Sequence, residues 1–142
     1  MRQDVLQKLA IDSTSTIEAR TIDITTTGRR TGASRRIEIV FYREGDDIYL
    51  SGIPAPKQRD WLINLRANPH FTFHLKHGAV ADLPAVATVI TDRTERRRVL
   101  NVFVNEFNRR NGSDSPWPTA VLDEWVERSP LVKVTFAGEP QT

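Results

Sequence analysis

A basic loop with the sequence GRRTGASRR occupies residues 28–36. It holds Arg29, Arg30, Arg35 and Arg36 and contains no acidic residue. Guanidinium groups form charge-assisted, often bidentate hydrogen bonds to phosphate or carboxylate, and glycines let backbone amides approach the same anion. The loop lacks the Gly-Lys-Ser/Thr ending of a Walker loop and the spacing of a dinucleotide fingerprint. It therefore predicts an anion receptor, with a solvated basic hairpin as the alternative.

A second group of residues follows a proline-rich loop, on a short helix predicted over residues 58–68. Trp61 and Asn64 are three residues apart and so occupy neighbouring positions on one helix face. An indole beside a carboxamide suits a flat heteroaromatic ligand. The alternative is that Trp61 and Leu65 anchor a small helix to the core.

The three histidines raise the question of a metal site. On a strand predicted over this segment, His70 and His74 share a face but lie about 13 Å apart, too far for one ion. We expect no metal, and we expect all three histidines, His77 included, at solvent-facing polar positions. A hydrolase built on Ser51 lacks support, because no Gly-x-Ser-x-Gly elbow surrounds that residue.

The composition limits the remaining chemistry. The chain has 142 residues, of which 39% are hydrophobic and 27% charged, so we expect one globular domain over residues 1–142. The absence of cysteine excludes disulfides, zinc thiolate sites and cysteine nucleophiles. No segment resembles a membrane span or a secretory signal, which predicts a cytoplasmic protein. The net charge of +2 is too small for a general nucleic-acid-binding protein.

Alternating β-branched and aromatic residues predict about six short strands. The strands are expected at residues 16–27, 35–43, 48–50, 71–75 and 131–136, with a strand pair over 80–90 that breaks at Pro84. Helices are expected at residues 2–11, 58–68, 92–112 and 119–127, the third opened by a capping box at Asp92 and closed near Gly112. This order fits a mainly β (α+β) fold, an antiparallel barrel or sandwich with a few peripheral helices.

The long helix carries a second basic cluster. Its apolar face is marked by Val99, Leu100, Phe103 and Phe107. Opposite this face we expect a solvated surface formed by Arg93, Arg96, Arg97 and Arg98. Binding of RNA or of an anionic membrane surface through these arginines is an alternative that we do not expect, because no aromatic RNA-reading motif accompanies them.

The basic loop and the Trp-Asn helix, in this order, resemble the deazaflavin (F420)-dependent nitroreductase family of the pyridoxamine phosphate oxidase-like superfamily. The first motif is TTGRRTG at residues 26–32 with Arg35, and the second is WLINLRANP at residues 61–69. The resemblance implies a six-stranded antiparallel split β-barrel. It also implies a protein that binds F420 and passes its hydride to a quinone, enone or nitro compound.

The resemblance assigns a cofactor-binding role to particular residues. The loop arginines and Thr31 would hold the phosphate and the oligoglutamate tail, and Ser51, Gly52 and Lys57 belong to the loop expected near the ring. The full expected set is Arg29, Arg30, Thr31, Arg35, Arg36, Ser51, Gly52, Lys57, Trp61 and Asn64. FMN is the alternative cofactor, because it also carries a phosphate and a tricyclic ring.

The expected function is therefore an F420-dependent reductase acting on a small, apolar hydride acceptor. Trp117, Trp125 and Phe107 are candidate walls of the acceptor site. Residues 116–125 lack the tyrosines of family nitroreductases, which argues against nitroreduction specifically. A non-catalytic carrier of F420 or FMN with the same fold is the alternative. No catalytic residue is predicted, and both a monomer and a homodimer stay open.

Overall fold

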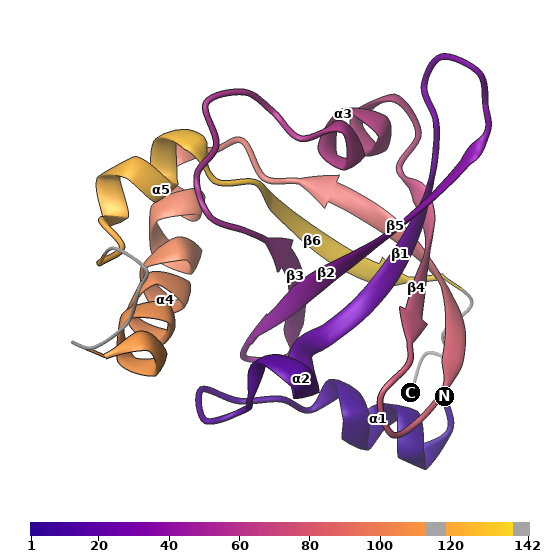
Figure 1. The fold of residues 1–142 in the computed structure, drawn as a ribbon, viewed down its shortest axis with the longest axis horizontal. Coiled ribbons are helices and arrows are strands. Elements are labelled where there is room, and N and C mark those ends of the chain that lie inside the picture. Colours follow the sequence, from indigo (N-terminus) through magenta and orange to yellow (C-terminus); the bar gives the residue numbers. More distant parts are fainter. Residues whose placement is uncertain (113–118, 138–142) are drawn as a thin grey trace.

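The computed structural model describes residues 1–112 and 119–137, and its strands form one closed barrel (Figure 1). The strands are β1 (Thr21–Thr27), β2 (Ser34–Glu44), β3 (Asp47–Ser51), β4 (His70–Leu75), β5 (Ala81–Val89) and β6 (Leu131–Phe136). They follow the order β1-β2-β3-β6-β5-β4, and all neighbouring pairs are antiparallel. The expected six-stranded antiparallel barrel is confirmed.

Side-chain alternation along the strands fills the barrel interior. In β1, Ile22 and Ile24 are fully buried, whereas their neighbours Thr21, Asp23 and Thr25 are partly exposed. Phe41 of β2 and Phe73 of β4 meet edge to face, with their ring centroids 5.4 Å apart. Burial of each such side chain contributes about 1.5–3 kcal/mol, so the interior is the main source of barrel stability.

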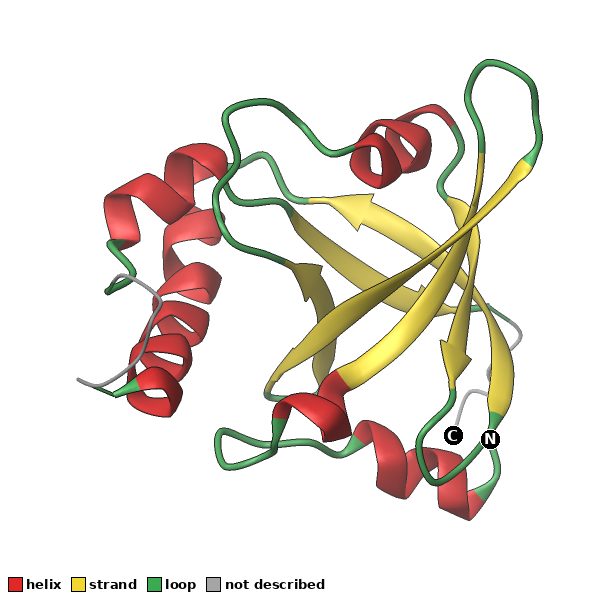
Figure 2. Cartoon of the chain, in the orientation of Figure 1, coloured by secondary structure: helices red, strands yellow, loops and turns green. Residues whose placement is uncertain are grey.

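Helices close the barrel ends and cover one side (Figure 2). They are α1 (Gln3–Leu9), α2 (Ile17–Arg20), α3 (Asp60–Ala67), α4 (Arg93–Asn111) and α5 (Leu122–Arg128). Helices α1 and α3 lie at opposite ends of the barrel (Figure 1), where α1 inserts Val5 and Leu9 into its core and α3 inserts Leu62 and Leu65. None of the helices in the described part of the chain combines the length and apolar character that crossing a membrane requires.

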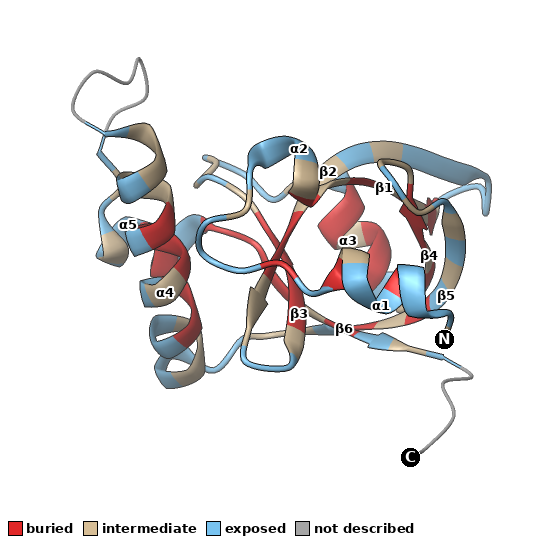
Figure 3. Ribbon diagram, turned by 90° about the horizontal axis from the view of Figure 1, so that it is seen from below, coloured by how far each residue is buried: buried red, intermediate tan, exposed pale blue. Residues whose placement is uncertain are grey.

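Helices α4 and α5 share a second core with β2 and β3 (Figure 3). Tyr42 of β2 stacks on Phe103 of α4 at a centroid distance of 4.6 Å. Phe107 of α4 meets Trp125 of α5 edge to face at 5.4 Å. Two of the three residues expected to wall an acceptor site thus join α4 to α5, and the third, Trp117, lies outside the described residues.

The long helix begins and ends as predicted. Asp92 accepts a hydrogen bond from the Glu95 amide at 2.9 Å, and Gly112 ends the helix with a φ of 63°. The prediction of a strand over residues 16–20 is wrong, because residues 17–20 form α2. Thr16 caps this helix by accepting a hydrogen bond from the Ala19 amide at 3.1 Å, a local bond that competes with strand pairing.

The predicted strand pair over residues 80–90 is also wrong, because β5 runs through Pro84 without a break. Pro84 is paired with Thr72 of β4, whereas pairing of β5 with β6 begins only at Ala85. The Pro84 carbonyl accepts a hydrogen bond from the Ala137 amide, so the proline nitrogen faces the side where that ladder has ended. The missing N–H of Pro84 therefore removes no hydrogen bond from the sheet.

His74 is buried and does not face solvent as predicted. Its Nε2 lies 2.7 Å from Thr25 Oγ1, and its Nδ1 lies 2.7 Å from Asp82 Oδ1. The hydrogen bond from His74 lowers the pKa of the Asp82 carboxyl group. His70, on the same strand, is exposed as expected. The outer face of β4 is therefore covered at His74 by side chains of both neighbouring strands.

Candidate functional site

A cavity of about 620 Å³ opens between the β1–β2 hairpin and α3, and we name it the loop cavity. Two segments that are about thirty residues apart in sequence meet here, as the two motifs require. Six of the expected cofactor-binding residues line the cavity: Arg29, Arg30, Thr31, Arg35, Trp61 and Asn64. The structure thus places the basic loop beside the Trp-Asn helix.

Glycines shape the tip of the hairpin, which projects beyond the barrel (Figure 1). The Gly28 amide donates to the Ala33 carbonyl at 2.8 Å, and the Gly32 amide donates to the Gly28 carbonyl at 2.9 Å. Gly32 has a φ of +74°, a conformation that side chains disfavour. A Cβ on Gly28 would lie only 3.0 Å from the Ala33 carbonyl oxygen. These glycines therefore permit the tight turn that carries the arginines.

Asn64 holds the hairpin against α3. Its side chain is buried, and its Oδ1 accepts from the Arg29 amide at 3.2 Å and from Arg29 Nη1 at 2.9 Å. Its Nδ2 donates to Thr26 Oγ1 at 3.3 Å. Arg29 also pairs with Asp60 at 3.4 Å. Asn64 and Arg29 thus shape the cavity wall through bonds within the protein.

We expect Asn64→Ala to lower the free energy of unfolding by about 1–3 kcal/mol, because the Arg29 amide and guanidinium group and the buried Thr26 hydroxyl lose their partner. The measurement is urea unfolding followed by tryptophan fluorescence. Asn105→Ala, at an exposed position of α4, is the control and should change stability little. Equal stability of the two variants would show that Asn64 does not hold the hairpin.

Arg36 lies away from the loop cavity because side chains alternate along β2. Arg35 faces the cavity, whereas Arg36 lies on the outer face and pairs with Asp23 at 2.9 Å. The same alternation returns Ile37 to the cavity wall, a position that sequence reasoning missed although its spacing from Arg35 indicated it. Thr26, Gly28 and Asp60 complete the lining.

The three expected residues near β3 also lie outside the loop cavity. The buried Ser51 hydroxyl donates to the Pro130 carbonyl at 2.7 Å, so it ties the end of β3 to the start of β6. Gly52 lies against the Arg59 guanidinium group, 3.5 Å from where its Cβ would be. Lys57 lines a different cavity, described next.

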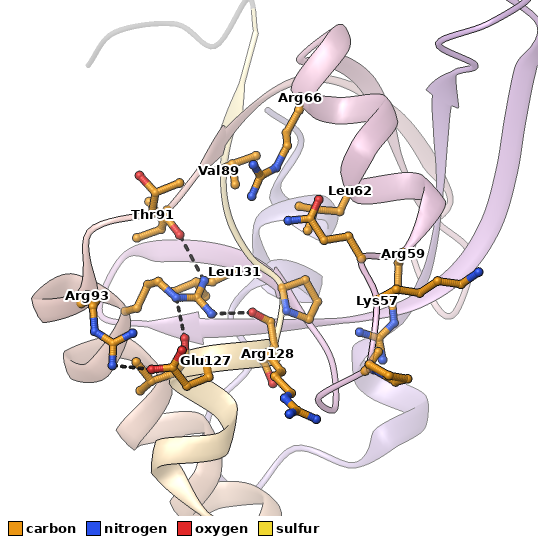
Figure 4. Close-up of a pocket in the computed structure, with 18 residues that line it drawn as sticks. Lys57, Arg59, Leu62, Arg66, Val89, Thr91, Arg93, Glu127, Arg128 and Leu131 are labelled. Carbon is orange, nitrogen blue, oxygen red and sulfur yellow. Dashed lines mark hydrogen bonds and ion pairs between the residues drawn. The ribbon is translucent and has the colours of Figure 1, made fainter.

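A second cavity of about 410 Å³ lies on the other flank of α3, and we name it the α5 cavity (Figure 4). Its walls come from residues 55–59, α3, the end of β5, the start of α4 and the segment from α5 into β6. Arg93 and Glu127 form an ion pair there at 2.5 Å, and this hydrogen bond lowers the pKa of Glu127 and raises that of Arg93.

Arg96 does not lie on a solvated face as predicted. Its guanidinium group donates to the carbonyls of Ile90, Trp125, Val126 and Ser129, at 2.6–3.3 Å. Burial lowers the pKa of Arg96, with the charge of Arg93 acting in the same direction. Arg97 and Arg98 are exposed as expected. Arg96 therefore joins α4 to α5 and to the end of β5.

The family of the chain follows from a match over most of its length. The model of a family described as F420H(2)-dependent quinone reductase matches residues 5–124, which include both motifs. The chain belongs to the F420H(2)-dependent quinone reductase family. This confirms the resemblance to F420-dependent reductases that the two motifs predicted. No curated protein matches this member of the F420H(2)-dependent quinone reductase family.

Solved structures share the fold of this quinone reductase family member at low sequence identity. A putative pyridoxamine 5'-phosphate oxidase from Listeria innocua has a TM-score of 0.60 and 14% identity, over 94% of this chain and 90% of its own. A structure described as an F420-H2 dependent reductase (FDR-A) has a TM-score of 0.53 and 18% identity, over 82% and 94%. A putative 5-nitroimidazole antibiotic resistance protein from Bacteroides thetaiotaomicron has a TM-score of 0.57 and 15% identity, over 96% and 81%.

Proposed function

We propose that the protein is an oxidoreductase that binds reduced F420 in the loop cavity and passes its hydride to a small apolar acceptor, such as a quinone or an enone. The observation that carries this proposal is the convergence of Arg29, Arg30, Arg35 and Thr31 with Trp61 around one cavity. Membership of the F420H(2)-dependent quinone reductase family supports the same cofactor.

The donors of the loop cavity fit the anionic part of F420. Within residues 1–112 and 119–137, no carboxylate lies within ion-pair distance of Arg30 or Arg35, so both guanidinium groups keep their donors for a ligand. The Thr31 hydroxyl accepts from the Ala33 amide at 3.2 Å and keeps its own proton to donate. Phosphate and the carboxylates of an oligoglutamate tail are the anions that such groups bind best.

The opposite wall fits the flat ring. Trp61 and Ile37 give the cavity an apolar surface beside the charged one. Bound F420 supplies the hydride; the protein binds and orients the coenzyme and limits the access of water to the reacting atoms. Arg30 and Arg35 fix the anionic end, while Trp61, held in place as part of the core, orients the ring end.

We expect Arg30→Ala and Arg35→Ala each to weaken F420 binding about tenfold or more, because each removes a charge-assisted contact of ~1.5–3 kcal/mol. A fluorescence titration of F420 measures this, with FMN titrated in parallel. Arg36→Ala is the matched control, because it removes the same charge one residue away on the outer face of β2. Equal loss in Arg35→Ala and Arg36→Ala would contradict the placement of the anion in the loop cavity.

Turnover is tested with reduced F420 and a series of quinones, enones and nitro compounds, by following the return of oxidised F420 absorbance. Oxidation that depends on both acceptor and protein, and that falls in Arg30→Ala at limiting cofactor, supports the reductase. Tight F420 binding without turnover on any acceptor would favour the carrier function. Preference for FMN in the titration would replace F420 as the cofactor of the same cavity.

A further inference from the structure

The α5 cavity has an excess of positive charge that the proposed reaction does not use. Six of its lining side chains are cationic and one is anionic: Lys57, Arg59, Arg66, Arg93, Arg96 and Arg128 against Glu127. Figure 4 shows arginines reaching the cavity from different elements, Arg66 from α3, Arg93 from the start of α4 and Arg128 from the end of α5. A cluster of like charges is costly to assemble unless an anion compensates it.

Three of these cations have no acidic partner in the part of the chain that the structure describes. Arg93 is neutralised by Glu127, and Arg96 is bonded to four carbonyls. Lys57, Arg66 and Arg128 have no carboxylate within ion-pair distance among residues 1–112 and 119–137. Arg59 donates to the Ile53 carbonyl at 2.7 Å, and burial lowers its pKa.

The floor of the cavity is apolar. Leu62, Val89 and Leu131 contribute aliphatic surface below the charged rim, and Figure 4 shows all three beside the arginines. A volume of about 410 Å³ holds a small organic molecule and is too small for a folded partner or a nucleic-acid strand. Charge, free donors and size together define the ligand class.

We propose that the α5 cavity is a second binding site, separate from the loop cavity, for a small organic polyanion that carries two or more phosphate or carboxylate groups. Arg66 and Arg128 bind the anionic groups from opposite sides, and Lys57 adds a third charge. Helix α3 separates the two cavities, because Trp61 and Asn64 face one and Leu62 and Arg66 face the other. The site is independent of F420 binding.

The test uses pyrophosphate and citrate as probes of the two anion chemistries, with calorimetric titration at low ionic strength. The Arg30→Ala/Arg35→Ala protein removes anion binding at the loop cavity, and all further variants are made on it. In this protein we expect at least one probe to bind, and Arg66→Gln/Arg128→Gln to weaken it about tenfold or more. Both arginines are exposed at the rim, so their replacement leaves the core intact.

A matched double variant controls for net charge. Arg97→Gln/Lys133→Gln removes two positive charges outside the cavity, and we expect it to leave probe binding unchanged. The stronger probe identifies the anion as phosphate or carboxylate. No binding of either probe, or equal loss in the two double variants, would overturn the proposal.

Discussion

Glu106→Ala should destabilise the protein by about 3–5 kcal/mol, the loss expected when one partner of a buried ion pair is removed. Arg20 Nη1 lies 3.3 Å from Glu106 Oε2, and the two side chains are 1% and 5% exposed. The pair joins α2 to the middle of α4. Loss of the carboxylate leaves a guanidinium charge without its counter-ion in the interior.

Other contacts keep Arg20 in place and prevent it from reaching solvent when Glu106 is lost. Its guanidinium group also donates to the carbonyls of Asp12 and Ser15, and it lies 5.8 Å from the centre of the Tyr42 ring. Burial lowers the pKa of Arg20, and the charge of Glu106 opposes that shift. The unpaired charge in the variant is therefore held where its desolvation is most costly.

Urea unfolding measures the loss, with Glu95→Ala as the control, because Glu95 forms an exposed pair with Arg98 on the same helix. The double variant Arg20→Met/Glu106→Leu removes both charges and should recover part of the lost stability, because the Asp12 and Ser15 carbonyls still lose their donor. If Glu106→Ala and Glu95→Ala had similar free energies of unfolding, the Arg20–Glu106 pair would not stabilise the protein by the expected amount.

Arg96→Ala should lower the free energy of unfolding by about 3 kcal/mol or more. Each hydrogen bond from a charged donor contributes ~1.5–3 kcal/mol, and several are lost together. The carbonyls of Trp125 and Val126 lie in the last turn of α5, where the helix dipole is negative. The Trp125 carbonyl also accepts from the Ser129 amide at 2.9 Å, whereas the Val126 carbonyl belongs to the group that a helix end leaves without a helical partner. Arg96 thus caps the end of α5 with a cation. We expect α5 to lose its position against α4 in the variant.

The control is Arg97→Ala, one residue along α4, where the side chain is exposed and pairs only with Asp123 among the described residues. Thermal unfolding should show a large drop in midpoint for Arg96→Ala and little change for Arg97→Ala. Near-ultraviolet circular dichroism follows the packing of the aromatic side chains, Trp125 among them. Similar midpoints for both variants would contradict the capping role of Arg96.

Local sequence patterns predicted the barrel because apolar and polar residues alternate regularly along its strands. Ile22 and Ile24, like Phe71 and Phe73, are spaced as a half-buried strand requires, and the structure buries all four. The prediction for the segment before Thr21 was wrong because its threonine and charged residues show no clear hydrophobic periodicity. The side-chain cap at Thr16 stabilises a helix there instead. The predicted break at Pro84 was wrong because a proline disrupts a strand only where its missing N–H would have paired. Whether it does so here depends on where β6 ends, which no local pattern reveals.

The candidate site was predictable where motif and local geometry agree. Arg29, Arg30 and Arg35 meet Trp61 and Asn64 as the two motifs required. The role of Arg96 was missed although its spacing from Val99, Leu100 and Phe103 put it on the buried face of α4, because its residue type suggested solvent. Its partners are backbone carbonyls in α5, at Ser129 and at Ile90, and backbone partners across a tertiary contact leave no mark in a sequence.

The position of β6 has a consequence for the synthesis of the chain. It is the last of the six strands to be made, yet it lies between β3 and β5, which are paired with it in the finished barrel. Until Leu131–Phe136 have emerged from the ribosome, β3 and β5 therefore expose open edges, the kind of surface on which nascent chains aggregate. Closure of the barrel therefore has to wait for the synthesis of β6, and a chain truncated before β6 would be left with both edges unprotected.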